Sequence, residues 1–184
     1  MHPISFQLLC VLGSALLYFG VFYLNVLFFG SLEFSAGVNW VFLPAGIRLL
    51  CTLLFVEAGV IGIFIASLAI NSSGMGSLDG VTGFGAACIS AGAPYLTYRL
   101  AQARGMTPSL QQLTAARLSV LIVMYAFTST LLHQIWFGLN GVSPHFIAGF
   151  SAMFMGDLVG TLIVIYVMKM VLAIARPPVK SHSK

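Results

Sequence analysis

The sequence has very few charged side chains. Only 7% of its 184 residues are charged, 59% are hydrophobic, and the mean hydropathy is +1.02. An ordinary soluble domain has about 25% charged residues, so the composition excludes a soluble catalytic, DNA-binding or receiver domain. We therefore predict an integral membrane protein with an all-α fold, built as a polytopic bundle of membrane-spanning helices.

Sequence motifs for catalysis and metal binding are also missing. The three cysteines, Cys10, Cys51 and Cys88, lie in apolar runs without CxxC or metal-ligand spacing, and we interpret them as small core residues. There is no Walker loop, GxGxxG, HExxH or Ser-His-Asp pattern. His133 and His145 without a third ligand make a weak case for a metal. We expect no enzymatic activity, no metal and no cofactor.

The apolar residues form about six runs of the length needed to cross a bilayer, which is about 20 residues per helix. The run from Val41 to Ser72 is too long for one untilted helix at about 1.5 Å per residue, so we divide it at Glu57-Ala58-Gly59. Residues 1–176 are predicted to be a single integral membrane domain, followed by a short basic tail at 177–184. The predicted helices are 5–30, 42–56, 59–71, 78–101, 107–137 and 145–174.

The fourth predicted helix is unusually rich in small residues. Gly83, Ala87 and Ala91 recur at four-residue spacing, which allows a neighbouring helix to approach closely. We therefore expect this helix to be central in the bundle.

The basic residues are concentrated in the connection between the fourth and fifth predicted helices and in the tail. We interpret this clustering as a signal for orientation and not for nucleic-acid binding, since Lys and Arg gather on the cytoplasmic side of membrane proteins. Six crossings then place both termini in the cytoplasm of a bacterium, with the chain in its inner membrane as a multi-pass protein. The two clusters are Arg99, Arg104 and Arg117, and Arg176, Lys180 and Lys184.

Asp157 is the residue that most needs an explanation, because more than ten uncharged residues flank it on either side. An ionised group near the middle of a bilayer is tolerated only with a partner or a polar cavity. Arg48 is the nearest candidate partner, since arginine is long and forks toward carboxylates. We expect the second and sixth helices to touch, with Arg48 and Asp157 forming either a ligand site or a structural ion pair.

Other polar and small residues support this pair. Gly156 and Gly160 bracket Asp157 with GxxxG spacing, which lets a neighbouring helix come close. His133 and Gln134 form a second intramembrane polar group. The supporting residues are Pro44, Gly46, Thr52, His133, Gln134, Gly156 and Gly160.

Two segments resemble a known family. Trp40-Val41-Phe42-Leu43-Pro44-Ala45-Gly46-Ile47 resembles the W-x-P-A-G entry of the first class of membrane-associated sensor (MASE-type) domains, and the segment from Ala152 to Gly160 is similar to their GD-x-x-G helix. The resemblance covers roughly residues 40–169. Its matching motif positions are Pro44, Gly46, Gly156, Asp157 and Gly160.

Members of that family usually precede diguanylate cyclase or histidine kinase domains, so the resemblance implies a sensor. The chain is shorter than the usual eight-helix module and ends just after its last predicted helix. We therefore expect a stand-alone, sensor-like membrane module that binds a small ligand or a partner membrane protein, such as a kinase, cyclase, permease or complex subunit. Two alternatives are a substrate-binding subunit of a transporter and an accessory subunit of a larger membrane complex.

Overall fold

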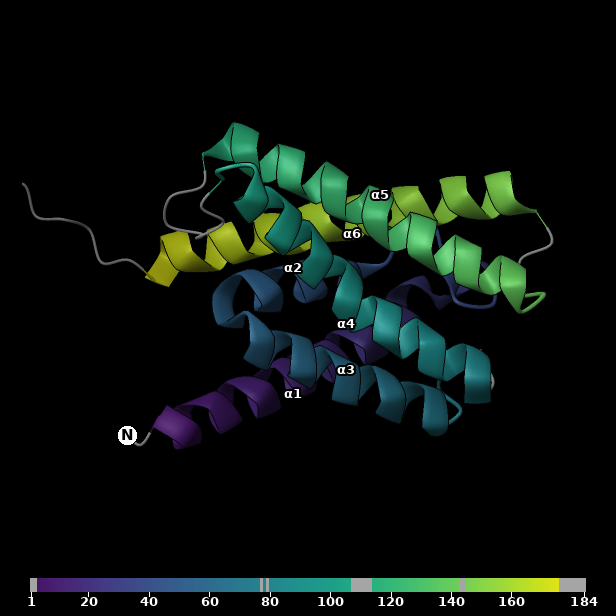
Figure 1. Ribbon diagram of the computed structural model, residues 1–184, viewed down its shortest axis with the longest axis horizontal. Coiled ribbons are helices and arrows are strands. Elements are labelled where there is room, and N and C mark those ends of the chain that lie inside the picture. The colour runs from purple at the N-terminus through teal and green to yellow at the C-terminus, as the bar shows by residue number, and fades with distance from the viewer. Residues whose placement is uncertain (1–2, 77, 79, 107–113, 143–144, 176–184) are drawn as a thin grey trace, which may run out of the picture.

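The structure is a computed structural model that describes residues 3–76, 78, 80–106, 114–142 and 145–175. Its helices run back and forth roughly along one direction, with the connections gathered at the two ends of the bundle (Figure 1). A small β-hairpin joins the first two helices. The elements are α1 (Pro3–Phe29), η1 (Gly30–Leu32), β1 (Glu33–Ser35), β2 (Val38–Asn39), α2 (Leu43–Phe55), α3 (Glu57–Ser72), α4 (Gly80–Ala103), α5 (Ala115–Leu139) and α6 (Phe146–Ala175).

The predicted all-α fold is confirmed, with six α-helices among the described residues, and most helix boundaries agree to within a few residues. The exception is the fifth helix, whose predicted start at Thr107-Pro108 lies outside the described residues. The described part of α5 begins at Ala115, where the hydroxyl of Thr114 accepts the N–H of Arg117 at 3.4 Å. Thr114 is therefore the N-cap of α5, a role that threonine commonly fills.

Three of the described helices are long and apolar enough to cross a membrane, namely α1, α5 and α6. α2 and α3 are apolar but shorter, with 13 and 16 residues. A 13-residue helix is only about 20 Å long, which is less than the hydrocarbon thickness of a bilayer. The chain therefore has the helices of a membrane protein, whereas six full crossings stay a prediction.

The division between α2 and α3 falls at Val56, next to the predicted Glu57-Ala58-Gly59. Val56 has φ 47° and ψ −115°, a backbone conformation that a β-branched residue rarely adopts. Three residues later α3 passes so close to the end of α2 that a Cβ at Gly59 would collide with the carbonyl of Cys51. The chain thus reverses within one residue, and α2 and α3 form a tight helical hairpin.

The central helix is α2, which contacts all five other helices. Residues 44–53 are all buried, as expected for a helix that is covered on every side. The prediction that the fourth helix is central was therefore wrong, since α4 packs on α2, α3 and α5. Its small residues serve local close packing instead, as at Gly85, where the ring of Trp136 occupies the space of a Cβ.

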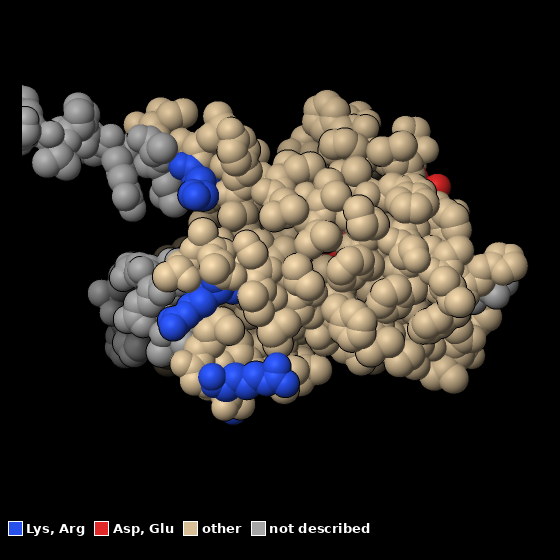
Figure 2. Space-filling model, turned by 90° about the horizontal axis from the view of Figure 1, so that it is seen from above, with Lys and Arg blue, Asp and Glu red and all other residues tan. Residues whose placement is uncertain are grey.

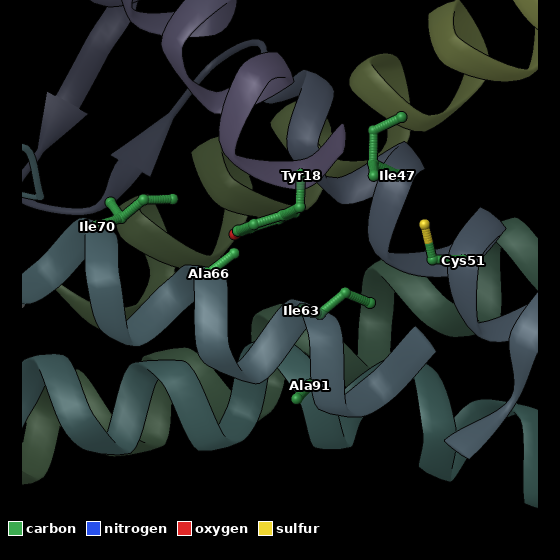
Figure 3. Close-up of a cluster of buried hydrophobic side chains, with 7 residues drawn as sticks. All are labelled: Tyr18, Ile47, Cys51, Ile63, Ala66, Ile70 and Ala91. Atoms are coloured by element: carbon green, nitrogen blue, oxygen red, sulfur yellow. The ribbon is translucent and has the colours of Figure 1, made fainter. Parts of the chain in front are cut away.

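Three clusters of buried side chains hold the bundle together. The first surrounds Tyr18 of α1, whose ring reaches over α3 toward Ala66 (Figure 3). The second joins α2, α4 and α5 around Leu49 and Tyr125. The third lies beneath the β-hairpin, where Val38 is fully buried beside Phe137. The hairpin, which the sequence analysis did not predict, therefore packs on the helices as a cap.

The exposed basic side chains of the described residues lie at one end of the molecule (Figure 2). Arg99 and Arg104 are at the end of α4, Arg117 is at the start of α5, and Lys169 is near the end of α6. The described residues of the opposite end, which carries the β-hairpin, contain no Lys or Arg. This asymmetry along the helix axes is the one expected of a bundle oriented by the positive-inside rule.

Candidate ligand site

Gly156 and Gly160 of α6 pack against the extended segment that leads into α2. The N–H of Phe42 donates to the carbonyl of Gly156 at 3.1 Å. A Cβ at Gly156 would collide with the carbonyl of Asn39, and one at Gly160 with the carbonyl of Phe42. The predicted contact between the second and sixth helices is confirmed, and at the end near the β-hairpin α6 contacts the extended segment that precedes α2.

The contact continues along α2. Gly46 lies against Thr161 and Val164 of α6, and a Cβ there would come within 2.6 Å of the Val164 side chain. Pro44 occupies the first turn of α2, where its missing N–H is not needed. The two segments that resemble sensor domains are therefore one packing unit, which positions Arg48 one turn after Pro44.

The start of α2 is capped by a residue of α1. The side-chain oxygen of Asn25 accepts the N–H of Leu43 at 2.8 Å, while the helix's own N-cap residue, Phe42, provides no side-chain hydrogen bond. Asn25 is almost fully buried. A polar side chain in this place satisfies a backbone donor that the start of the helix would otherwise leave without a partner.

Arg48 is buried at the centre of the bundle and bound to α1. Its Nε and Nη2 donate to the hydroxyl of Tyr18 at 3.0 and 2.7 Å. Its guanidinium carbon lies 5.4 Å from the centre of the Tyr18 ring and 5.0 Å from that of Phe42, within the range of cation–π attraction. Nη1 is buried and has no hydrogen-bond partner among the described residues.

Asp157 is fully buried in the same region, within electrostatic reach of Arg48 and of Tyr125. Neither carboxylate oxygen has a hydrogen-bond partner in the part of the chain that the structure describes. The expected direct pair between Arg48 and Asp157 is therefore not formed, and the hydrogen-bond partner of Arg48 is the hydroxyl of Tyr18 instead. The negative charge still lowers the free-energy cost of burying the positive one.

His133 is buried on α5 and bonded on both ring nitrogens. Nδ1 lies 2.9 Å from the carbonyl of Ser129, which can only accept, so Nδ1 carries the proton. Nε2 then accepts from the hydroxyl of Ser90 on α4 at 3.5 Å. No group of three potential metal ligands among His, Cys, Asp and Glu is found among the described residues.

The other two supporting residues serve different purposes. Thr52 is fully buried, and its hydroxyl donates to the carbonyl of Arg48 at 2.8 Å, one turn earlier in α2. The buried hydroxyl therefore has its partner within its own helix. Gln134 is fully buried on α5 and its amide nitrogen lies 3.8 Å from the sulfur of Met153 on α6. Gln134 therefore joins α5 to α6, whereas Thr52 bonds within α2.

A cavity of about 260 Å³ extends from the β-hairpin end of the bundle inward to Arg48. Exposed residues of the connections, such as Glu33 and Gly74, line its outer part, and buried residues line its inner part. The inner wall combines apolar rings, among them Phe42, with polar side chains from five helices. The polar residues of the inner wall are Asn25, Arg48, Ser67, Ser90 and His133.

The structure therefore separates the predicted site into two parts. Arg48 and His133 line the cavity, whereas Pro44, Gly46, Thr52, Gln134, Gly156, Asp157 and Gly160 are buried around it and do not line it.

Four polar residues that touch Arg48, cap α2 or line the inner wall were not predicted, namely Tyr18, Asn25, Ser67 and Ser90. A signal for the first two was present. Ser14, Tyr18 and Asn25 recur at helical spacing in an otherwise apolar run, so they share the inward face of α1.

Comparison with known proteins finds no matching family model, no matching curated protein and no matching solved structure. The resemblance to MASE-type sensor domains therefore depends on the motif residues alone.

Proposed function

We propose that this chain is a sensor-like integral membrane module that binds a small ligand in the cavity above Arg48. It would lie in the bacterial inner membrane with the basic end of the bundle in the cytoplasm. The cavity would then open on the outer side, where a molecule from the periplasm could enter. The resemblance of residues 40–47 and 152–160 to sensor domains supports this assignment.

The observation that carries the proposal is a cavity whose wall has buried polar atoms without partners. Nη1 of Arg48 and Oγ of Ser67 are both buried and lack hydrogen bonds to described residues, and both residues line the cavity. Leaving such groups unbonded destabilises a folded protein by about 1–3 kcal/mol each. Neither atom has surface on the cavity as it stands, so a polar ligand would satisfy them after these two side chains turn toward it.

The position of the cavity also suits a sensor. Its wall is formed by α1 to α6 and by the β-hairpin, and α2, which carries Arg48, contacts every other helix. A ligand that draws Arg48 toward it would therefore shift the helix that all the others pack against. Such a shift would change the positions of the helix ends that a partner protein contacts on the cytoplasmic side.

Thiol labelling from outside the cell tests whether the cavity opens there. In a Cys88→Ser background, Ser67→Cys should react with a small membrane-impermeant methanethiosulfonate added to cells whose outer barrier is permeabilised. Ile63→Cys is the matched control, since Ile63 is one turn away on α3, fully buried and not part of the cavity wall. The background protein measures any reaction of the buried Cys10 and Cys51.

Selective reaction of Ser67→Cys from the outside is the expected result. Reaction of Ser67→Cys only after the inner membrane is opened would contradict the proposed orientation. Equal reaction at positions 63 and 67 would show that the labelling reports general unfolding and that the cavity is not a specific site.

A further inference from the structure

We propose that an anionic phospholipid binds at the basic end of α4, with its phosphate group at Arg99 and an acyl chain along the helix toward Gly92. This surface lies at the opposite end of the bundle from the mouth of the cavity, so it is independent of any ligand bound there. Three features support the proposal: an arginine held in one position, an exposed apolar surface beside it, and an excess of positive charge.

Arg99 is exposed, yet its guanidinium is held by a neighbouring tyrosine. Its Nη1 donates to the hydroxyl of Tyr95 at 3.2 Å, and its guanidinium carbon lies 5.8 Å from the centre of the Tyr95 ring. The Tyr95 hydroxyl in turn donates to Glu57 of α3 at 3.4 Å. No described residue accepts a hydrogen bond from Nε or Nη2 of Arg99. These nitrogens are therefore available to the oxygens of a phosphate group, which arginine binds well.

Two tyrosines place this part of α4 at the membrane surface. The rings of Tyr95 and Tyr98 are stacked, with their centroids 6.3 Å apart and an interplanar angle of 16°. The hydroxyl of Tyr98 accepts from the amide nitrogen of Gln102 at 2.9 Å. Tyrosine is enriched at membrane–water interfaces, where its ring lies among apolar groups and its hydroxyl among polar ones. Arg99, next in the sequence, then lies at the depth of the lipid phosphate groups.

The surface of α4 on the membrane side of Arg99 is apolar and open. Leu96, one turn before Arg99, is 43% exposed. One turn further, Gly92 is exposed, and a Cβ built there would meet nothing within 4 Å. Residues 92, 96 and 99 share one face of the helix, because they are spaced by four and three residues. An acyl chain below a phosphate at Arg99 would therefore lie on Leu96 and against the backbone of Gly92.

The described residues of this end carry more positive than negative charge. Arg99, Arg104, Arg117 and Lys169 are all exposed there (Figure 2), and Glu57 is the only acidic residue that the structure describes at this end. A basic side chain near a membrane surface strengthens the attraction to anionic lipids about fivefold. The charge balance therefore favours a lipid with a net negative headgroup over a zwitterionic one.

The four basic residues differ in how firmly they are held. Lys169 on α6 is as exposed a cation as Arg99, but it donates no hydrogen bond to another described residue. A side chain that is already fixed loses less conformational entropy when it binds. We therefore assign the specific contact to Arg99, and Lys169 provides the matched control for charge alone.

Native mass spectrometry of the full chain measures the binding of individual lipids. The protein in a neutral detergent is titrated with phosphatidylglycerol as the anionic probe, or with phosphatidylcholine of the same acyl chains as the zwitterionic one. We expect phosphatidylglycerol to bind about fivefold or more tightly. Glycerol phosphate, which has a phosphate group but no acyl chain, should neither bind nor displace the lipid.

Three variants locate the binding. Arg99→Gln removes the guanidinium and should lower the affinity for phosphatidylglycerol about fivefold. Lys169→Gln removes the same charge from α6 and should leave that affinity almost unchanged. Tyr95→Phe keeps the charge but releases the guanidinium, so its affinity should lie between these two. Positions 99 and 169 are exposed, and an unchanged thermal unfolding temperature verifies that the variants fold.

Several results would overturn the proposal. Equal losses in Arg99→Gln and Lys169→Gln would show that charge in general attracts the lipid, without a site at Arg99. Equal affinities for the two lipids would exclude a preference for anionic headgroups. Binding of glycerol phosphate that Arg99→Gln abolishes would assign the surface to a soluble phosphate compound. Tighter binding of a polyglutamate peptide, also lost in Arg99→Gln, would assign it to an acidic protein segment.

Discussion

Arg48 and Tyr18 are joined by two hydrogen bonds to a single hydroxyl, at 3.0 Å from Nε and 2.7 Å from Nη2. This contact links the central helix α2 to α1 across 30 residues of sequence. It fixes the edge of the guanidinium formed by Nε and Nη2, and so sets the position of Arg48 in the wall of the cavity. The contact therefore has both a structural role and a role in preparing the proposed site.

Tyr18→Phe removes this hydroxyl and leaves the ring in place. Because the buried guanidinium then loses the acceptor of two donors, we expect the free energy of unfolding to fall by about 1.5–3 kcal/mol. Unfolding in mixed detergent micelles measures the change. Tyr23→Phe on the same helix is the control, since Tyr23 is 55% exposed and should show almost no effect. Equal effects at both positions would show that Tyr18 does not anchor Arg48.

Gly156→Ala and Gly160→Ala test the contact between α6 and the entry to α2. Each new Cβ would collide with a backbone carbonyl, that of Asn39 or of Phe42, and a backbone cannot move aside as a flexible side chain can. We expect a loss of stability of about 1–3 kcal/mol for each.

Gly92→Ala is the matched control on α4, where a Cβ meets nothing within 4 Å. Because alanine is the better helix former, this change should stabilise the protein by up to about 1 kcal/mol. A stabilising effect at position 156 or 160 would contradict the close contact. The thermal unfolding temperature of the purified protein is sufficient to decide the sign.

Asn25→Ala removes the acceptor for the first N–H of α2. Loss of a helix cap typically destabilises a protein by about 1 kcal/mol, and we expect a loss of this size here. Leu24→Ala, at the neighbouring exposed position, provides the comparison. Hydrogen exchange of the Leu43 amide offers a direct readout, and an unchanged rate in Asn25→Ala would refute the capping role.

Val56→Gly tests the strained reversal between α2 and α3. At φ 47° valine is under strain that glycine does not have, so the substitution should leave stability unchanged or raise it by about 1 kcal/mol. Val60→Gly, one turn into α3, should instead destabilise the helix by a similar amount. A larger loss at position 56 than at position 60 would show that the valine side chain is needed at the reversal.

The helices could be predicted because their apolar runs have the length and composition of membrane helices. The length of the run from Val41 to Ser72 showed that it must contain a break, and the predicted position at Glu57-Ala58-Gly59 lies next to the observed break at Val56. The contact between α2 and α6 was predicted from two residues, Arg48 and Asp157, that a bilayer would not tolerate in isolation. The β-hairpin could not be predicted, because strands of three and two residues are too short to give a sequence pattern. Its position depends on the burial of Val38 against the helices.

The details of the site could not be predicted from charge alone. Opposite charges suggested that Asp157 binds Arg48, but a neutral hydroxyl from α1 takes this place. Likewise, the small residues of α4 suggested a central helix, yet the central position belongs to α2. In both cases the deciding factor is which helix lies next to which, and a single sequence does not contain that information in a local pattern.

The proposed site depends most directly on whether the Arg48 guanidinium is buried and bonded to Tyr18. The NMR signals of the arginine Nε–H groups report this burial. In ¹⁵N-labelled protein in nanodiscs, the Arg48 Nε–H should exchange slowly with water and escape broadening by spin-labelled lipids. The exposed Arg99 and Arg104 should exchange rapidly, and Tyr18→Phe should accelerate exchange at Arg48. An Arg48 signal that exchanges as rapidly as theirs, or that the lipid label broadens, would contradict a guanidinium anchored inside the bundle.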